Sequence, residues 1–246
     1  MLTKILGFIF ILVFFGLMVF FAFRSRRKST GPLRDIPAFA KLRRSVGLSV
    51  EAGNRLHISL GRGNLLSTQS AVAFIGLSAL VRIARATSVS DRPPIATSGD
   101  GGITILSQDT LRTTSRKYRA ESDPISGRLS GLTPYSYAAG TLSLIHDGDV
   151  SANVLLGSFG SEVALISEAG ERSGSLTLAG TDDIAAQAVI FASAHEPLIG
   201  EETYASGAYL GAGPMHVASL NAQDILRWVL AGAIVVGALL KLVGVL

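Results

Sequence analysis

Cysteine is absent from the sequence, and its absence removes one class of chemistry. No thiolate is available as a nucleophile or as a soft metal ligand. The absence also fits a reducing compartment, where disulfide bonds are rare, although many exported proteins lack cysteine too. Cysteine usage therefore tells us more about chemistry than about location.

Motifs for catalysis and nucleotide binding are lacking as well. No Gly-x-Ser-x-Gly elbow occurs, and no Walker lysine follows a glycine loop. Gly61-Arg62-Gly63 begins like a dinucleotide fingerprint, but Leu66 stands where the third glycine is needed. His195-Glu196 lacks the second histidine of a zinc-binding helix. We therefore assign no catalytic residue, no metal ligand and no cofactor. Enzyme activity stays undecided, and a protein that is not an enzyme is favoured.

Acidic residues are scarce in the first half of the chain, and basic residues in the second. Residues 24–128 hold eighteen bases and seven acids, whereas residues 129–224 hold eleven acids and one base. Few aromatic side chains that could stack on bases lie among the basic residues, so we expect no nucleic acid partner despite the pI near 9.6. Two interpretations remain open. Either the two halves face each other within one domain, or the basic face of one copy contacts the acidic face of the next.

A long apolar segment stands at each end of the sequence. Residues 5–23 are all apolar or glycine, and as a helix they would extend about 28 Å, close to the thickness of a hydrocarbon core. This is longer than the apolar stretch of a secretory signal, which favours an uncleaved anchor. The second segment has two basic residues near its ends, whose long side chains can reach the head groups. We predict a transmembrane anchor over residues 1–24 and a transmembrane helix over residues 225–246.

Basic residues flank the first span on one side only. Residues 24–44 contain eight bases and one acid, whereas Lys4 alone marks the other side. Because short basic loops stay in the cytoplasm, we expect an inner-membrane protein whose central domain is cytoplasmic and whose two termini lie outside. Residues 25–45 are predicted as a basic juxtamembrane linker, with membrane lipid as its partner. The residues expected at the membrane surface are Arg24, Arg26, Arg27, Lys28, Arg227 and Trp228.

Residues 46–221 have the length and pattern of one α/β domain. Short apolar runs end in turn residues and lead into helical stretches, which is typical of a Rossmann-like parallel sheet flanked by helices. The predicted strands are 56–60, 94–97, 153–156, 175–179 and 188–192. The predicted helices are 68–86, capped by Ser67, 102–120, and 134–145, capped by Thr133; residues 121–132 are predicted as an exposed loop.

In open parallel sheets, ligands bind beyond the carboxyl ends of the strands. Glycines at these turns also allow tight packing, so nucleotide binding rests on analogy with the fold alone. Asp182 and Asp183 together could hold a divalent ion, but a helix start is favoured for them. The candidate ligand-binding residues at the predicted strand ends are Gly61, Arg62, Gly63, Asn64, Ser98, Gly99, Asp100, Gly157, Ser158, Gly160, Ser161, Asp182, His195 and Glu196.

Several short segments of the sequence resemble those of a known family. These segments are residues 55–57 with 60–63, 90–94 with 96–100, 157–164, and 195–202. Over nearly its whole length the chain resembles a bacterial family of membrane-anchored proteins known only as a domain of unknown function. The resemblance implies a bacterial membrane protein of a kind not classified as an enzyme. It brings no activity, cofactor or active residue.

Two functions from different classes remain open. The favoured one is a non-catalytic, membrane-anchored scaffold or accessory subunit, which forms a homo-oligomer or joins other subunits of a membrane complex. Small residues in the second span would let helices approach closely. They are Ala231, Gly232, Ala233, Gly237 and Ala238. The alternative is a membrane-tethered cytoplasmic domain that binds a small polar ligand or a nucleotide, with or without catalysis.

Overall fold

The computed structural model describes residues 2–27, 34–67, 70–118 and 126–243. The chain divides into two compact units. One unit is Asp35–Ala212, which holds the whole sheet. The other combines Met1–Arg34 with Gly213–Leu246, the two ends of the chain.

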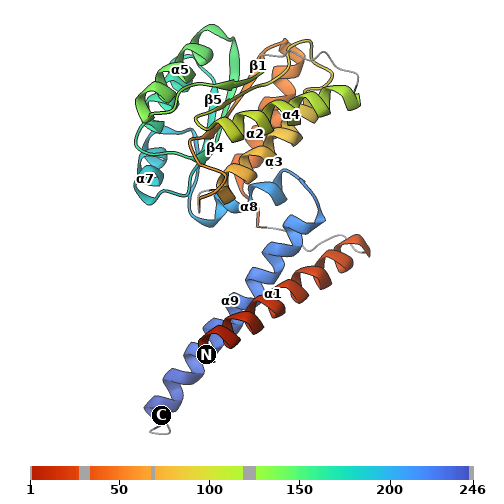
Figure 1. Cartoon of the computed structure of the whole chain (residues 1–246), viewed down its shortest axis with the longest axis vertical. Helices are drawn as coiled ribbons and strands as arrows, with labels where there is room; N and C mark the ends of the chain where they lie inside the picture. The colour runs from red at the N-terminus through yellow and green to blue at the C-terminus, as the bar shows by residue number, and fades with distance from the viewer. Residues whose placement is uncertain (1, 28–33, 68–69, 119–125, 244–246) are drawn as a thin grey trace. The chain divides into compact units, whose positions relative to one another are not determined.

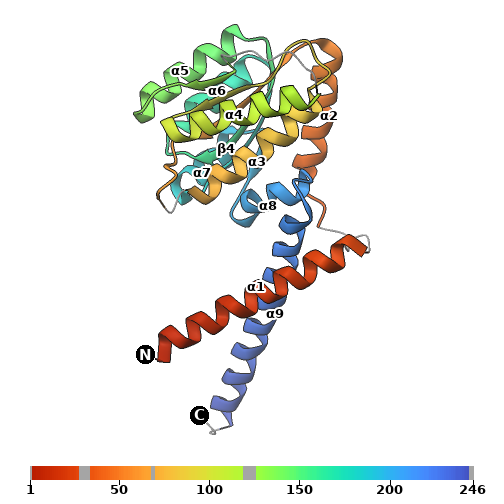
Figure 2. The ribbon, with the colours of Figure 1, turned by 45° about the vertical axis from the view of Figure 1, so that its right-hand side comes forward.

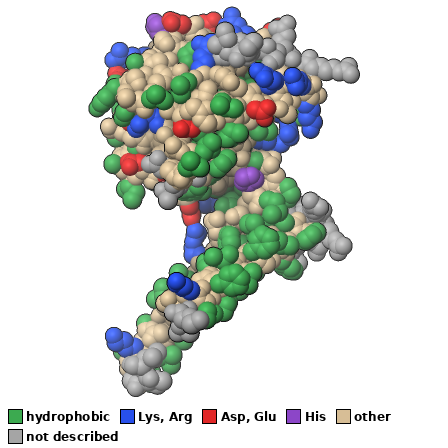
Figure 3. All heavy atoms as spheres, in the orientation of Figure 1, with side chains coloured by type: hydrophobic (Ala, Val, Ile, Leu, Met, Phe, Trp, Pro, Cys, Tyr) green, Lys and Arg blue, Asp and Glu red, His purple; other side chains and the backbone are tan. Residues whose placement is uncertain are grey.

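The terminal unit consists of two long apolar helices, α1 (Leu2–Arg27) and α9 (Pro214–Leu242), which pack against each other. Both are long and apolar enough to cross a membrane. Hydrophobic side chains are exposed along both helices (Figure 3). Helix α9 begins well before residue 225, because the polar stretch ahead of the apolar segment continues the same helix. Among the predicted membrane-surface residues, Lys28 lies outside the described part of the chain.

The central unit contains a six-stranded parallel sheet with helices on both faces, as the sequence predicts (Figures 1 and 2). Its strand order is β3-β2-β1-β4-β5-β6, the doubly wound order of the Rossmann fold, which reverses between β1 and β4. Every neighbouring pair is parallel. The strands are β1 (Arg55–Gly61), β2 (Ile95–Ser98), β3 (Gly127–Leu129), β4 (Val150–Ser158), β5 (Leu176–Gly180) and β6 (Glu196–Leu198).

Seven helices of the described central unit cover the two faces of this sheet. Helices α2 (Pro37–Ala52), α3 (Ser70–Ala86), α4 (Gly101–Tyr118) and α8 (Glu201–Tyr209) lie on one face. Helices α5 (Pro134–Asp147), α6 (Val163–Arg172) and α7 (Ile184–Ser193) lie on the other. The predicted cap of α5 is confirmed: the Thr133 side chain accepts from the Ser136 amide, and Pro134 occupies the first turn.

Side chains alternate along β1 between two separate cores. Leu56, Ile58 and Leu60 join the apolar core under α2, α3, α4 and α8. His57 and Ser59 point the other way, toward α5. Both sets are fully or almost fully buried, so β1 is a central strand with no solvent-facing side.

One strand prediction and one loop prediction were wrong. Residues 188–192 form part of helix α7, not a strand, because a short apolar run fits a buried strand and a helix equally well. The strand lies just beyond, at β6, where Pro197 is tolerated because β6 is the last strand of the sheet. The predicted loop 121–132 contains β3, which is too short to show a pattern.

The predicted linker 25–45 overlaps helix α2. Its side chains Phe39 and Leu42 are each only 1% exposed, and they belong to the core of the central unit. The apolar positions of α2 are interleaved with three basic residues, which hid the helix within a basic segment. Part of the basic segment is therefore structural.

Candidate functional site

The candidate site is the carboxyl edge of the sheet where the strand order reverses, between β1 and β4. Beyond the end of β1, the Arg62 amide donates to Ser158 O at 2.8 Å, and the Gly99 amide donates to Gly61 O at 2.9 Å. Gly61 has a φ of +70°, and a Cβ there would lie 2.3 Å from Ser158 O. Glycine is needed at this position, and the backbones beyond β1 and β4 lie in direct contact.

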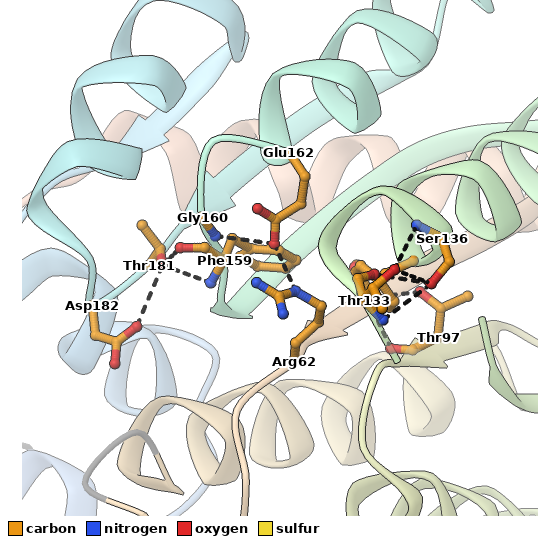
Figure 4. A network of polar contacts seen from close by, with 11 residues as sticks. Arg62, Thr97, Thr133, Ser136, Phe159, Gly160, Glu162, Thr181 and Asp182 are labelled. Carbon is orange, nitrogen blue, oxygen red and sulfur yellow. Dashed lines mark hydrogen bonds and ion pairs between the residues drawn. The ribbon is translucent and has the colours of Figure 1, made fainter. Parts of the chain in front are cut away.

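An ion pair between Arg62 and Glu162 lies beside this contact (Figure 4). Arg62 Nε donates to Glu162 Oε1 at 2.9 Å, and the Gly160 amide donates to the same oxygen at 3.1 Å. The Glu162 side chain is only 2% exposed, so these donors compensate a carboxylate that burial would otherwise penalise. A Cβ on Gly99 would lie 2.4 Å from Arg62 Cγ, which explains the glycine there. The protein's own side chains thus occupy the strand switch point.

Aspartates that the sequence offers as ligands serve as helix caps. Asp100 Oδ1 accepts from the Ile103 amide at 3.0 Å, at the start of α4. Asp183 Oδ1 accepts from the Ala186 amide at 2.7 Å, so the favoured helix start is confirmed for Asp183. Asp182 lies next to Thr181, whose hydroxyl accepts from the Phe159 amide at 3.0 Å (Figure 4). Within the described residues, no group of three or more His, Asp or Glu could hold a metal ion.

Most of the predicted ligand-binding residues lie at one edge of the sheet, but two do not. His195 and Glu196 stand at the amino end of β6, because the strand expected before them is a helix. Glu196 pairs with Lys41 at 2.5 Å, and His195 Nδ1 accepts from the Thr177 amide at 3.3 Å. Those at or near the carboxyl ends of β1, β2, β4 and β5 are Gly61, Arg62, Gly63, Asn64, Ser98, Gly99, Asp100, Gly157, Ser158, Gly160, Ser161 and Asp182.

A buried polar network lies behind this edge, between the sheet and α5. His57 Nδ1 bonds Asn153 Oδ1 at 2.6 Å, and His57 Nε2 bonds Thr97 Oγ1 at 2.8 Å. Burial lowers the pKa of His57 to about 4, although the bond to Asn153 opposes the shift. Burial also raises the pKa of the Tyr137 hydroxyl, which bonds Ser59 Oγ at 2.5 Å. Both groups are therefore uncharged near neutral pH.

Comparison with family models decides the classification. The model described as Domain of unknown function (DUF6754) matches residues 1–246, the whole chain. The chain belongs to this family. A search of curated proteins and a search of solved structures each find no match. Family membership in DUF6754 names no activity, so function has to be argued from the geometry.

Sequence reasoning missed two features of this DUF6754 chain. Glu162 was not among the candidates. An acidic residue two positions after Gly160, in the turn that follows β4, is nevertheless a signal for a side chain that bonds back to the backbone of that turn. The second feature is a cavity of about 350 Å³ within the central unit. It is lined by Leu42, Arg43, Val46, Arg82, Ile83, Arg85, Ala86 and Leu210. Arg43 had been interpreted only as a juxtamembrane base, and Arg82 and Arg85 stand one turn apart near the end of α3.

Proposed function

We propose that this protein is a membrane-anchored, non-catalytic scaffold or accessory subunit that self-associates through helix α7. In this proposal α1 and α9 are anchors in the inner membrane, the central unit is cytoplasmic and both termini lie outside. The two helices that are long and apolar enough to cross a membrane support anchoring. Its partners are then membrane lipid, further copies of the chain and other subunits of a membrane complex.

The observation that carries self-association is the apolar outward face of α7. Ile184 is 84% exposed and Phe191 is 72% exposed. Ala185, Ala188 and Ala192 are also exposed, so the outward positions repeat with helical spacing. Large apolar side chains grouped on one helix face mark an interaction surface more often than isolated ones do.

A second copy of the same chain suits this face. Helix α7 contains no Lys, Arg, Asp or Glu between Ile184 and Ser193, so two copies would not repel each other there. The alanines leave room for a second helix between the two bulky side chains. A contact of α7 with α7 would be isologous, the type found in two-fold symmetric dimers.

The second candidate span supports the same proposal. A Cβ on Gly232 or Gly237 would meet nothing within 4 Å, so packing against α1 does not use these glycines. Small residues allow close approach of helices in a membrane. They remain available for a helix of another copy or of another subunit.

The uneven charge distribution adds little to this proposal. In the described part of the chain, ion pairs join bases of the first half to acids of the second, among them Lys41 with Glu196, Arg62 with Glu162, and Arg92 with Asp149. These contacts support the interpretation that the halves face each other within one domain. A head-to-tail contact between copies stays a prediction and is not required.

Native size in mild detergent tests the proposal. We expect the full chain to run as an oligomer, and the Ile184→Ser/Phe191→Ser variant to run as a smaller species. Val89→Ser is the matched control, since Val89 is 80% exposed but lies outside α7. A wild-type monomer with no copurifying partner would reject the proposal, as would equal dissociation by the control.

A ligand-binding function is the second candidate, and the doubly wound strand order favours it. Dinucleotides bind at the switch point in this order of strands. Here Glu162 neutralises Arg62 at that point, which leaves less positive charge for a phosphate. Thermal shift of the full chain against a nucleotide and metabolite panel tests it. A ligand at a hundred times its Kd should stabilise the fold by about 2.7 kcal/mol. No shift with any compound would remove this candidate.

A further inference from the structure

The cavity between α2, α3 and the end of α8 combines an apolar lining with arginines. Five of its lining residues are apolar: Leu42, Val46, Ile83, Ala86 and Leu210. The other three are Arg43, Arg82 and Arg85. All eight lie within Asp35–Ala212, so the cavity belongs to the central unit alone. Its volume of about 350 Å³ falls at the lower end of the range for small-molecule sites.

Positive charge at this cavity is not neutralised by the described protein residues. No Asp or Glu lines it, and none of its three arginines takes part in an ion pair in the described ranges. Lys41, by contrast, pairs with Glu196 from a neighbouring position of the same helix α2. The cavity therefore presents cations without counter-ions beside apolar surface.

Two of these arginines also have a structural role, which fixes their position. Arg82 Nε donates to Leu210 O at 2.8 Å, and Arg43 Nη1 donates to Tyr209 O at 3.5 Å. These carbonyls belong to the end of α8, where basic side chains are favoured. Gly211, with a φ of +72°, leaves space for Arg82, since a Cβ there would lie 2.9 Å from Arg82 Nη2. A guanidinium has five N–H donors, so each arginine keeps donors for another acceptor.

We propose that this cavity binds an anionic phospholipid, with one acyl chain on the apolar lining and the phosphate on the arginines. Arginine suits phosphate because its planar donors match two oxygens at once. A zwitterionic lipid would bring a second positive charge toward the arginines, and a free phosphate would leave the apolar lining uncovered. Only a molecule that is both apolar and anionic satisfies the whole surface.

A membrane lipid is the source we assign, and this step rests on the membrane anchorage proposed above, not on self-association. Along the chain, residues 211–224 separate the cavity residue Leu210 from the apolar segment that begins at residue 225. Residues 214–224 are the helical start of α9, at a rise of about 1.5 Å each, so the covalent tether to the candidate span is short. Lipid head groups are therefore the abundant anionic amphiphiles near this part of the chain.

Native mass spectrometry of the full chain in mild detergent tests the assignment. Phosphatidylglycerol and phosphatidylcholine of equal chain length are added at equal concentration, and retained adducts are compared. We expect phosphatidylglycerol to be retained preferentially and Arg85→Gln to weaken its binding about tenfold. Arg85 is exposed, and its side chain forms no hydrogen bond or ion pair within the described residues, so the loss of its charge should leave the fold intact.

Arg44→Gln is the matched control, because it removes the same charge from an exposed position of α2 that does not line the cavity. Equal retention of the two lipids by the wild type, or equal weakening by Arg44→Gln, would overturn the proposal. Displacement of the lipid by an equal concentration of glycerol phosphate or laurate would overturn the assignment to a membrane lipid. The same spectra record the oligomer mass, so failure of lipid binding and failure of self-association are distinguished.

Discussion

The two faces of the sheet are both buried, but they differ in how many polar side chains they bury. Toward α2, α3, α4 and α8 the sheet presents Leu56, Ile58 and Leu60 from β1, with Val154 and Leu156 from β4. Toward α5, α6 and α7 it presents Leu155 and Ala179, which belong to the second core, together with polar side chains that are all 0% exposed. The polar side chains are His57, Ser59, Thr97, Asn153 and Thr177.

This difference means that the two faces stabilise the fold by different physics. The apolar face gains free energy roughly in proportion to buried area and tolerates changes of shape that keep volume. The polar face depends on partners, because a buried polar atom without a hydrogen bond costs about 1–3 kcal/mol. Its bonds are directional, so we infer that the polar face fixes the register of α5 on the sheet while the apolar face supplies most of the stability.

The largest difference in the free energy of unfolding is expected between substitutions at two neighbouring residues of β1. Leu60→Ala removes a fully buried side chain from the apolar face and should lower the free energy of unfolding by about 2–5 kcal/mol. Ser59→Ala on the polar face should cost about 1 kcal/mol, because Tyr137 OH keeps Thr97 Oγ1 within 3.3 Å. Chemical denaturation of the full chain in mild detergent measures both. Equal losses would contradict the division into two faces.

Low pH should reduce the free energy of unfolding through His57 on the polar face. Unfolded histidine takes up a proton near pH 6.5, whereas burial delays protonation of folded His57 to about pH 4. The unfolded state therefore binds more protons between these values, and stability falls as the pH falls through this window. The loss attributable to His57 between pH 7 and pH 4 is about 3 kcal/mol.

The His57→Gln variant isolates this contribution, because an amide can hydrogen-bond but does not titrate. Its stability should decline less than that of the wild type between pH 6.5 and pH 4, when both are unfolded in denaturant at each pH. Parallel pH profiles for the two proteins would show that His57 is accessible to protons in the folded state.

Glycines on the two faces should respond differently to alanine. A Cβ on Gly76 of α3 would lie 2.2 Å from the backbone oxygen of Leu156, whereas a Cβ on Gly170 of α6 would lie 2.3 Å from Thr177 Oγ1. Each substitution should cost about 1–3 kcal/mol by overpacking. Thr177→Ala should rescue Gly170→Ala, because it removes the side chain that the new Cβ would meet. No substitution can rescue Gly76→Ala in this way, because its new Cβ would meet a backbone oxygen. A double-mutant cycle with no coupling would disprove the close approach at Gly170.

The sequence predicts the apolar face better than the polar one. The runs Leu56–Leu60 and Asn153–Leu156 are dominated by apolar residues, and they locate β1 and β4 correctly. The same runs do not show that His57 and Asn153 bond each other, because that pairing depends on the register of strands 96 residues apart. Contacts set by tertiary register have no local pattern.

The candidate site could be predicted only in part, for the same reason. Residues that follow β1, β2 and β4 fall at one edge, because parallel strands place their carboxyl ends together. His195 and Glu196 were misplaced with the strand assigned before them. The Arg62–Glu162 pair and the arginine cavity join positions far apart in sequence, so only the fold brings them together.

The smallest change in unfolding free energy is expected for Thr177→Val on β5. Its comparison with Thr97→Val on β2 distinguishes the part of the polar face around His57 from the part on β5. Thr97 Oγ1 bonds His57 Nε2, so Thr97→Val should cost about 1–3 kcal/mol by leaving a buried ring nitrogen unpartnered. Thr177 Oγ1 is buried without a partner in the described residues, so Thr177→Val replaces a desolvated hydroxyl by a methyl of similar shape. It should be neutral or raise the free energy of unfolding by up to about 1 kcal/mol. Denaturation of both variants gives the comparison. A destabilising Thr177→Val would mean that its hydroxyl is hydrogen-bonded in solution, and the polar face would then be a continuous network from β2 to β5.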